Sequence, residues 1–163
     1  MSIPAPKVAE SEKRAARLAA FISLLKKELG YEFKIHEKFE DRLKLQKYVF
    51  IADHFGLNSG YDFSMYVRGP YSPELAEDYY RRLDVESTLP PEFRSQDFIN
   101  LVKDKDVKWL EIAATVLLIY DYNRERGVSR EDIIKIATKI KPWANERVNG
   151  VLDELIKSNL IRL

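Results

Sequence analysis

The sequence predicts a mainly α-helical fold with a small β element, an α+β class with a winged-helix-like C-terminal part. Apolar residues recur at three- and four-residue spacing over most of the 163 residues, which is the period of an amphipathic helix. One stretch, residues 61–67, instead alternates apolar and polar side chains, which is the period of a half-buried strand. Hydrophobic residues make up 45% and charged residues 33% of the chain, so we expect a globular core.

The chain is expected to form one domain with two lobes. Residues 1–8 contain two prolines and are predicted to be a disordered tail, followed by a single α-rich domain over residues 9–163. An N-terminal lobe over residues 9–88 holds the strand and its Gly-Pro turn, and a helical, winged-helix-like lobe covers residues 95–163. A chain of this length can build one core that both lobes share.

Two apolar stripes that end at glycines predict the first two helices. The first stripe lies on residues 9–29 and consists of Leu18, Phe21, Ile22, Leu25 and Leu29. Gly30 then stands where a helix C-cap belongs. A second stripe predicts a helix over residues 41–55, and Gly56 closes it.

The stretch YVRGPYSPELAEDYY, residues 66–80, predicts a strand that meets a helix at a tight corner. Pro70 favours an extended or turn conformation at Gly69 and therefore ends the strand. Ser72 before Pro73 is the arrangement of an N-cap followed by proline at the first helical position. This local explanation accounts for most of the stretch.

Capping residues and one apolar run predict the helices of the C-terminal lobe. Ser95 is expected to cap a short helix and Asp106 a long one. The apolar run of the long helix, residues 109–120, is too short to cross a bilayer and indicates a buried helix. Ser129 and Asp132 resemble a capping box at the start of the next helix.

The order of elements in this lobe suggests a DNA-binding alternative. Helix, turn, helix and an apolar tail, NLIRL, expected as a short strand, follow one another as in a winged helix. The candidate recognition helix covers residues 144–158, and its candidate DNA contacts are Asn145, Arg147 and Asn149. The 27 basic and 26 acidic residues leave a net charge of +1, which counts against broad binding of a phosphate backbone. A subdomain that packs or dimerises is the structural alternative, so a homodimer stays open.

The composition argues against several kinds of chemistry. The chain has no cysteine and only two histidines, His36 and His54, so we expect no disulfide, no thiolate catalysis, no metal centre and no cofactor. P-loop, G-x-G-x-x-G and G-x-S-x-G motifs are all missing, and we expect no enzyme. An unrecognised carboxylate site is the remaining enzymatic alternative. His54 is expected to contact free carbonyls at the end of the second helix.

The start of the chain and the residue usage indicate where the protein works. MSIPAPKVAE lacks the basic and apolar regions of a signal peptide, and a chain without cysteine fits a reducing compartment. We therefore expect a cytoplasmic protein with no membrane segment. Many Lys and Glu residues, with only two Gln, resemble the usage of a thermophile.

An exposed surface beside the corner is the candidate site for a protein partner. Alternation places Tyr66 and Arg68 on the face opposite the apolar strand residues, and tyrosine and arginine are enriched at interface hot spots. Lys44 and Lys47 are three residues apart and share a helix face. The predicted partner-binding residues are Lys44, Lys47, Tyr66, Arg68 and Tyr71.

Each of these residues also has a purely structural interpretation. Arg68 could pair with a local carboxylate such as Glu74 or Asp78, and Tyr71 could pack into the corner. The basic cluster of Arg42, Lys44 and Lys47 could form a solvated helix face, which is the usual meaning of such a cluster.

Two motifs in this region resemble a known family. RLKLQKYVFIADHFGL, followed after an aromatic-rich strand by YVRGPYSPELAEDYYRRL, resembles the YwgA-like prokaryotic proteins and, more distantly, the Panacea domain of SocA-like antitoxins. The likeness covers residues 41–83 well and the helical remainder in outline. The matching positions are Lys44, Leu45, Gln46, Lys47 and Tyr48, then Tyr66, Gly69, Pro70, Tyr71, Ser72, Pro73, Glu74 and Leu75.

This resemblance implies a mostly helical fold with a small β element and no established catalysis. Panacea antitoxins are thought to bind and neutralise partner toxins. Our first hypothesis is therefore a non-catalytic, antitoxin-like protein that recognises another protein. A winged-helix DNA-binding transcriptional regulator is the alternative.

Overall fold

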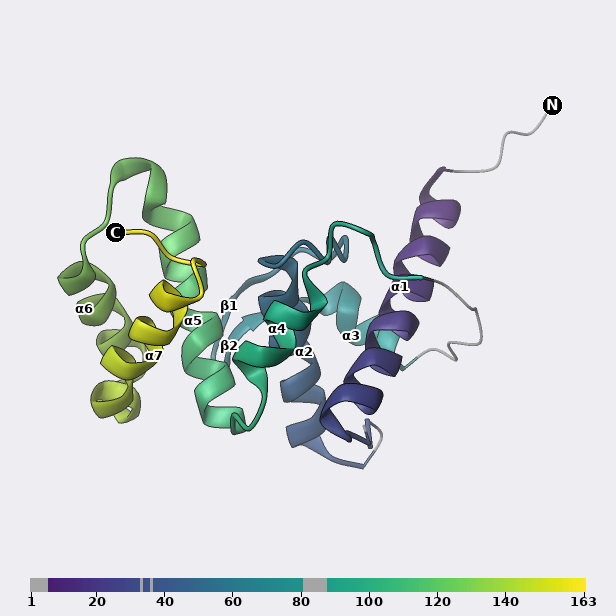
Figure 1. Ribbon diagram of the computed structural model, residues 1–163, viewed down its shortest axis with the longest axis horizontal. Helices are drawn as coiled ribbons and strands as arrows, with labels where there is room; N and C mark the ends of the chain where they lie inside the picture. The colour runs from purple at the N-terminus through teal and green to yellow at the C-terminus, as the bar shows by residue number, and fades with distance from the viewer. Residues whose placement is uncertain (1–5, 33, 36, 81–87) are drawn as a thin grey trace.

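The computed structural model describes residues 6–32, 34, 35, 37–80 and 88–163 of the chain (Figure 1). Over these residues it is mainly helical, with one two-stranded antiparallel sheet, so the predicted fold class is confirmed. The elements are α1 (Pro6–Leu29), α2 (Phe39–Asp53), β1 (Ser64–Tyr66), β2 (Gly69–Tyr71), α3 (Pro73–Tyr79), α4 (Ser95–Val102), α5 (Val107–Asn123), the 3₁₀ turn η1 (Arg124–Arg126), α6 (Arg130–Ile140), the 3₁₀ turn η2 (Pro142–Ala144) and α7 (Asn145–Lys157).

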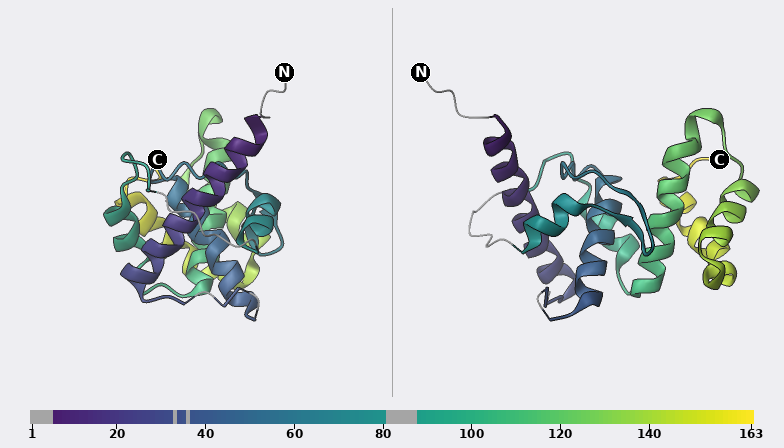
Figure 2. Two further views of the ribbon diagram at one scale, coloured as in Figure 1. Left: turned by 90° about the vertical axis from the view of Figure 1, so that its right-hand side faces the viewer. Right: turned by 180° about the vertical axis from the view of Figure 1, so that it is seen from behind.

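Helix α5 forms the centre of the molecule. It is buried continuously from Trp109 to Ile119, because a helix that is apolar on all sides is stable only when other elements surround it. α2 and β2 pack against it on one side and α6 and α7 on the other, while α1 lies at the far end beside α3 (Figure 2). The apolar core is continuous across the two expected lobes.

None of the helices in the described part of the chain is long and apolar enough to span a membrane. The prediction that the run over residues 109–120 forms a buried helix is confirmed over residues 109–119, all of which are buried in α5.

The β element is a hairpin rather than a single strand. β1 pairs with β2 so that Met65 lies opposite Pro70 and Tyr66 opposite Gly69. The prediction that Pro70 ends the strand is therefore wrong, since Gly69 and Pro70 both lie inside the second strand. The alternation also stops early, because Val67 lies at the turn and is 90% exposed.

Gly69 allows the hairpin to lie close against α5. Its φ angle is +90°, and a Cβ atom at this position would stand 2.9 Å from Thr115 Oγ1. A left-handed φ and a contact this short both require glycine.

The capping predictions hold at three of four helices. The side chains of Ser72, Asp106 and Ser129 each accept a hydrogen bond from a backbone N–H at the start of α3, α5 and α6. At Ser129 the capping box is complete in both directions. The prediction for Ser95 is wrong, because Ser95 is the first residue of α4 and Arg94 occupies the N-cap position.

Two helix boundaries differ from those expected. α1 begins at Pro6, so residues 6–8 belong to a helix instead of the predicted disordered tail, while residues 1–5 lie outside the described residues. α2 covers Phe39–Asp53, two residues earlier than the apolar stripe indicated.

The C-terminal tail is not the predicted strand. Asn159 has a φ angle of +61°, and the N–H groups of Leu160 and Ile161 both donate to the carbonyl of Leu155. This left-handed turn directs the chain back over the end of α7, and the Ile161 side chain enters the core at 1% exposure. α6, η2 and α7 keep the helix–turn–helix order, but the described tail forms no wing strand.

Candidate functional site

A pocket of about 380 Å³ lies where α2, the β1–β2 hairpin and the end of α3 meet. We call it the hairpin pocket. Arg42, Lys47 and Arg68 bring positive charge to it, and Gln46 and Gly69 complete the lining. Its aromatic and aliphatic walls consist of Phe39, Leu43, Tyr66, Val67, Tyr71, Tyr79 and Tyr80.

Gln46 joins α2 to the corner between β2 and α3. Its Nε2 donates to the Ser72 carbonyl at 3.0 Å, and the Ser72 N–H donates to its Oε1 at 2.9 Å. Both polar ends of a side chain that is 1% exposed are thus satisfied. Sequence reasoning treated Gln46 only as part of a helix motif, because its partner lies 26 residues away.

Lys47 lies beneath the hairpin and is fully buried. Its Nζ donates to the Pro70 carbonyl at 2.6 Å. Burial lowers the pKa of Lys47 to about 7; the charge of Glu111 opposes this shift, and the charges of Lys141 and Arg68 add to it. The expectation that Lys47 shares an exposed face with Lys44 is therefore wrong.

Glu111 is the buried carboxylate around which the hairpin and the C-terminal lobe meet. It is 3% exposed. Arg68 Nε donates to its Oε1 at 3.1 Å, and Lys141 Nζ donates to its Oε2 at 2.7 Å. Lys141 also donates to the Val67 carbonyl at 3.2 Å. A buried charge this well paired avoids the large penalty of an isolated one.

Arg68 does pair with a carboxylate, but not with either of the local ones considered in the sequence. Asp78 instead accepts from Arg14 Nε at 2.9 Å and from the Tyr61 hydroxyl at 2.7 Å. Glu74 accepts from the Ser72 hydroxyl at 3.4 Å. The actual partner, Glu111, is 43 residues away in the sequence, and no local pattern indicates it.

The rim of the hairpin pocket carries the exposed side chains. Tyr66 is 49% exposed and the Arg68 side chain 53% exposed, so their predicted exposure is confirmed. The half-buried Tyr71 ring packs edge-on against Tyr66 at 5.2 Å. Phe39, 55% exposed, lies 5.7 Å from the guanidinium carbons of both Arg42 and Arg68.

The structure brings four of the five predicted partner-binding residues to one place. Lys47 forms part of the base, and Tyr66, Arg68 and Tyr71 line the walls. Lys44 does not line the pocket, since its Nζ lies 4.6 Å from the centre of the Tyr31 ring. Phe39 and Arg42 were missed as site residues. Arg42 belongs to the basic cluster with Lys44 and Lys47, whose usual meaning is a solvated face, and a single aromatic at a helix start carries no pattern of its own.

The three candidate DNA contacts do not come together as a free basic surface. Both terminal guanidinium nitrogens of Arg147 donate to the Asp106 carboxylate, at 3.1 and 3.4 Å, and these hydrogen bonds lower the pKa of Asp106. Asn149 Oδ1 accepts from Arg130 at 3.1 Å, and Asn145 is exposed at the first residue of α7.

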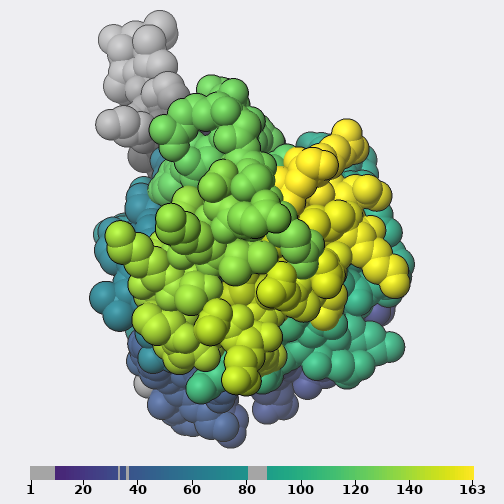
Figure 3. All heavy atoms as spheres, turned by 90° about the vertical axis from the view of Figure 1, so that its left-hand side faces the viewer, coloured from purple at the N-terminus to yellow at the C-terminus, as the bar shows by residue number. Residues whose placement is uncertain are grey.

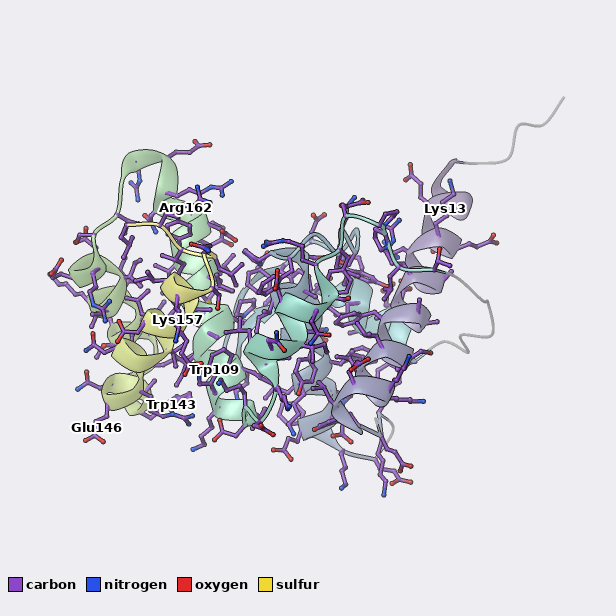
Figure 4. All side chains as sticks on the ribbon, in the orientation of Figure 1. Lys13, Trp109, Trp143, Glu146, Lys157 and Arg162 are labelled. Atoms are coloured by element: carbon purple, nitrogen blue, oxygen red, sulfur yellow. The ribbon has the colours of Figure 1, made fainter. Side chains whose placement is uncertain are left out.

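The face of the molecule formed by α6 and α7 is seen in Figure 3. Trp143 in η2 and Glu146 in the first turn of α7 project from the same end of this lobe (Figure 4), so an acidic side chain stands beside the candidate contacts. Arg130 is also held by Asp153, at 2.7 Å.

His54 caps α2, as expected. Its Nδ1 lies 2.9 Å from the Phe50 carbonyl and its Nε2 lies 2.7 Å from Asp121 Oδ2. Burial acts to lower its pKa, but the hydrogen bond and charge of Asp121 raise the pKa above its usual value. His36 lies outside the described residues. Within the described ranges, no three His, Asp or Glu side chains gather in a way that could hold a metal ion.

Comparison of the chain with protein-family models, with curated proteins and with solved structures found no match in any of the three. The resemblance to YwgA-like proteins and Panacea domains therefore stays a prediction.

Proposed function

We propose that this protein is a non-catalytic recognition module that binds another protein through the hairpin pocket. The observation that carries the proposal is the joint presence of exposed Tyr66, Arg68 and Phe39 side chains around an aromatic-lined hollow. Tyrosine and arginine anchors that surround a pocket are typical of the centres of protein interfaces.

The base beneath these side chains is suited to presenting them in one orientation. Gln46 holds the corner by two hydrogen bonds, Lys47 holds the Pro70 carbonyl, and Glu111 holds Arg68. A surface that is ordered before binding loses less conformational entropy when the partner arrives. The hairpin pocket therefore offers a preformed anchor site.

A binding role explains the buried polar groups better than a catalytic role does. The amide nitrogen and oxygen of Gln46 both form hydrogen bonds within the chain. So do the two carboxylate oxygens of Glu111. Lys47 has no exposed surface, so a substrate in the pocket has no direct path to its amine. These groups serve to hold the hairpin.

The sequence favours an antitoxin-like role and a cytoplasmic location. The resemblance to Panacea domains implies a toxin as the partner, and the lack of cysteine fits a reducing compartment. The partner is to be identified by affinity purification with the tagged protein from the organism whose genome encodes this chain.

We expect Tyr66→Ser to abolish capture of the partner, because the change removes an exposed aromatic anchor without touching the core. The measurement is affinity purification with the tagged protein, followed by a binding assay with each purified candidate. The matched control is Tyr122→Ser, which alters a tyrosine that is 61% exposed on α5, outside the hairpin pocket.

A genuine partner is retained by wild type and by Tyr122→Ser and lost by Tyr66→Ser. If all three proteins retained the partner equally, the hairpin pocket would not be part of the interface. Arg68→Glu is a poorer test, because it would place a second carboxylate against buried Glu111 and disturb the fold.

DNA binding through α7 is our second candidate, because α6, η2 and α7 keep the helix–turn–helix order. The pairing of Arg147 with Asp106 counts against it. An electrophoretic shift that weakens steeply with salt would support DNA binding, and the lack of any shift at low salt would dismiss it.

A further inference from the structure

The hairpin pocket has more positive than negative charge. Of the twelve lining residues within the described chain, Arg42, Lys47 and Arg68 are basic, Lys47 with its pKa lowered to about 7, and none is acidic. The nearest carboxylate partner is Glu111, behind the hairpin, and it is shared by Arg68 and Lys141. One buried carboxylate therefore serves two of the four basic side chains in this region.

The other two basic side chains donate hydrogen bonds to neutral groups. Arg42 Nη1 donates to the Ile35 carbonyl at 2.7 Å, and Lys47 Nζ donates to the Pro70 carbonyl at 2.6 Å. Within the described residues, no carboxylate forms an ion pair with either of them. Arg42 in addition keeps guanidinium donors beyond the one that binds Ile35.

Two guanidinium groups at the rim lie close to the same aromatic ring. Arg42 and Arg68 both have their central carbon 5.7 Å from the ring centre of Phe39. An anion at this rim could receive hydrogen bonds from either group, and guanidinium groups match the planar shape of a carboxylate. The walls around this point are aromatic and aliphatic, so the group next to the anion has to be apolar.

We propose that the hairpin pocket anchors a segment of the partner protein that carries a carboxylate side chain next to a large apolar one. The carboxylate contacts Arg42 and Arg68 at the rim, and the apolar side chain enters the tyrosine-lined hollow. This inference rests on the proposed function and specifies the chemistry of the partner. Charge complementarity favours it over a basic or a purely apolar segment.

Two short peptides with blocked ends test the inference on the unaltered full-length chain. The first is acetyl-Ala-Phe-Glu-Leu-Ala-amide, and the second has Gln in place of Glu. Binding is followed by ¹H–¹⁵N NMR titration. We expect the Glu peptide to bind about tenfold more tightly than the Gln peptide, since charge-assisted hydrogen bonds are worth more than neutral ones, with shifts at the amides of Tyr66, Arg68 and Gly69.

Arg42→Gln identifies the cation responsible. It should reduce the affinity for the Glu peptide to that of the Gln peptide, while Arg124→Gln, an exposed arginine at the end of α5, should leave the affinity unchanged. A normal NMR spectrum of each variant shows that it is folded. The peptide comparison on wild type does not depend on any variant.

Equal affinity for the two peptides, shifts located elsewhere, or no binding at all would each overturn the inference. If a protein partner is nevertheless lost on Tyr66→Ser, the proposed function stands and only the carboxylate anchor is wrong. If the Glu peptide binds as expected but no partner depends on Tyr66, the anchor is right and the proposed function is wrong.

Discussion

The ammonium group of Lys47 lies in a part of the molecule where positive charges outnumber negative ones. Lys141 and Arg68 add to the effect of burial, and Glu111 alone opposes it. The side chain has no exposed surface, so water cannot compensate for the charge. The cost of holding this amine beneath the hairpin therefore depends on whether it carries a proton.

The stability of the protein should change with pH through this residue. The pKa of Lys47 is about 7 in the folded chain and 10.5 in the unfolded chain. Between pH 7 and 10.5 the unfolded state binds more protons, so the free energy of unfolding contributed by Lys47 rises with pH, by up to about 1.4 kcal/mol per pH unit. Well below pH 7, where both states carry the proton, this contribution should be constant.

Urea unfolding of wild type and Lys47→Met at pH 7, 8 and 9 isolates the effect. The difference in unfolding free energy, wild type minus variant, should increase across this range, because methionine has no proton to lose. A difference that stays flat would show that Lys47 keeps its ordinary pKa in the folded chain.

At the scale of the elements, the hairpin pocket exists because α2, the hairpin and α3 are held in one arrangement. The β1–β2 hairpin has only three residues in each strand, and a two-stranded sheet of this size is not stable by itself. Its position depends on the contact of Gly69 with α5 and on the bonds between Gln46 and Ser72.

Gln46→Ala should destabilise the protein by about 1–3 kcal/mol, because it leaves the buried N–H of Ser72 without its partner. The Ser72 carbonyl loses the Gln46 amide but still accepts from the Ala76 N–H. The measurement is the free energy of unfolding in urea. The matched control is Gln96→Ala on α4: this exposed glutamine donates to Asn100 within one helix, and its loss should cost less than about 0.5 kcal/mol. Similar losses for both variants would show that Gln46 does not hold the corner.

Across the whole molecule, Glu111 connects three parts of the chain. It lies on α5, it accepts from Arg68 on the hairpin, and it accepts from Lys141 between α6 and η2. Both Glu111 and Lys141 are almost fully buried, with side chains 3% and 4% exposed. The ion pair therefore joins the N-terminal and C-terminal lobes through the central helix.

Glu111→Gln should lower the free energy of unfolding by about 3–5 kcal/mol, because it leaves Lys141 buried without an opposite charge. Glu12→Gln, which alters an exposed carboxylate on α1, is the control and should have little effect. A loss below about 1 kcal/mol for Glu111→Gln would mean that the pair contributes little to joining the lobes.

The sequence alone determined the helical class, the apolar faces and three of the helix caps. These features depend on residues three or four positions apart, and such spacing can be recognised in a single sequence. Ser72 before Pro73 predicted the start of α3, and the run after Asp106 predicted the buried central helix. The exposure of Tyr66 also followed from local alternation, whereas Arg68 is exposed because it lies in the turn after β1.

The tertiary structure alone decided what surrounds the hairpin pocket. Gln46 meets Ser72 across 26 residues, Lys141 meets Glu111 across 30, and Arg68 meets Glu111 across 43. Contacts at such separations arise when whole elements pack, and no local spacing encodes them. This is why Lys47, expected on an exposed face, is buried, and why Phe39 and Arg42 belong to a site that their own neighbours in the sequence do not indicate.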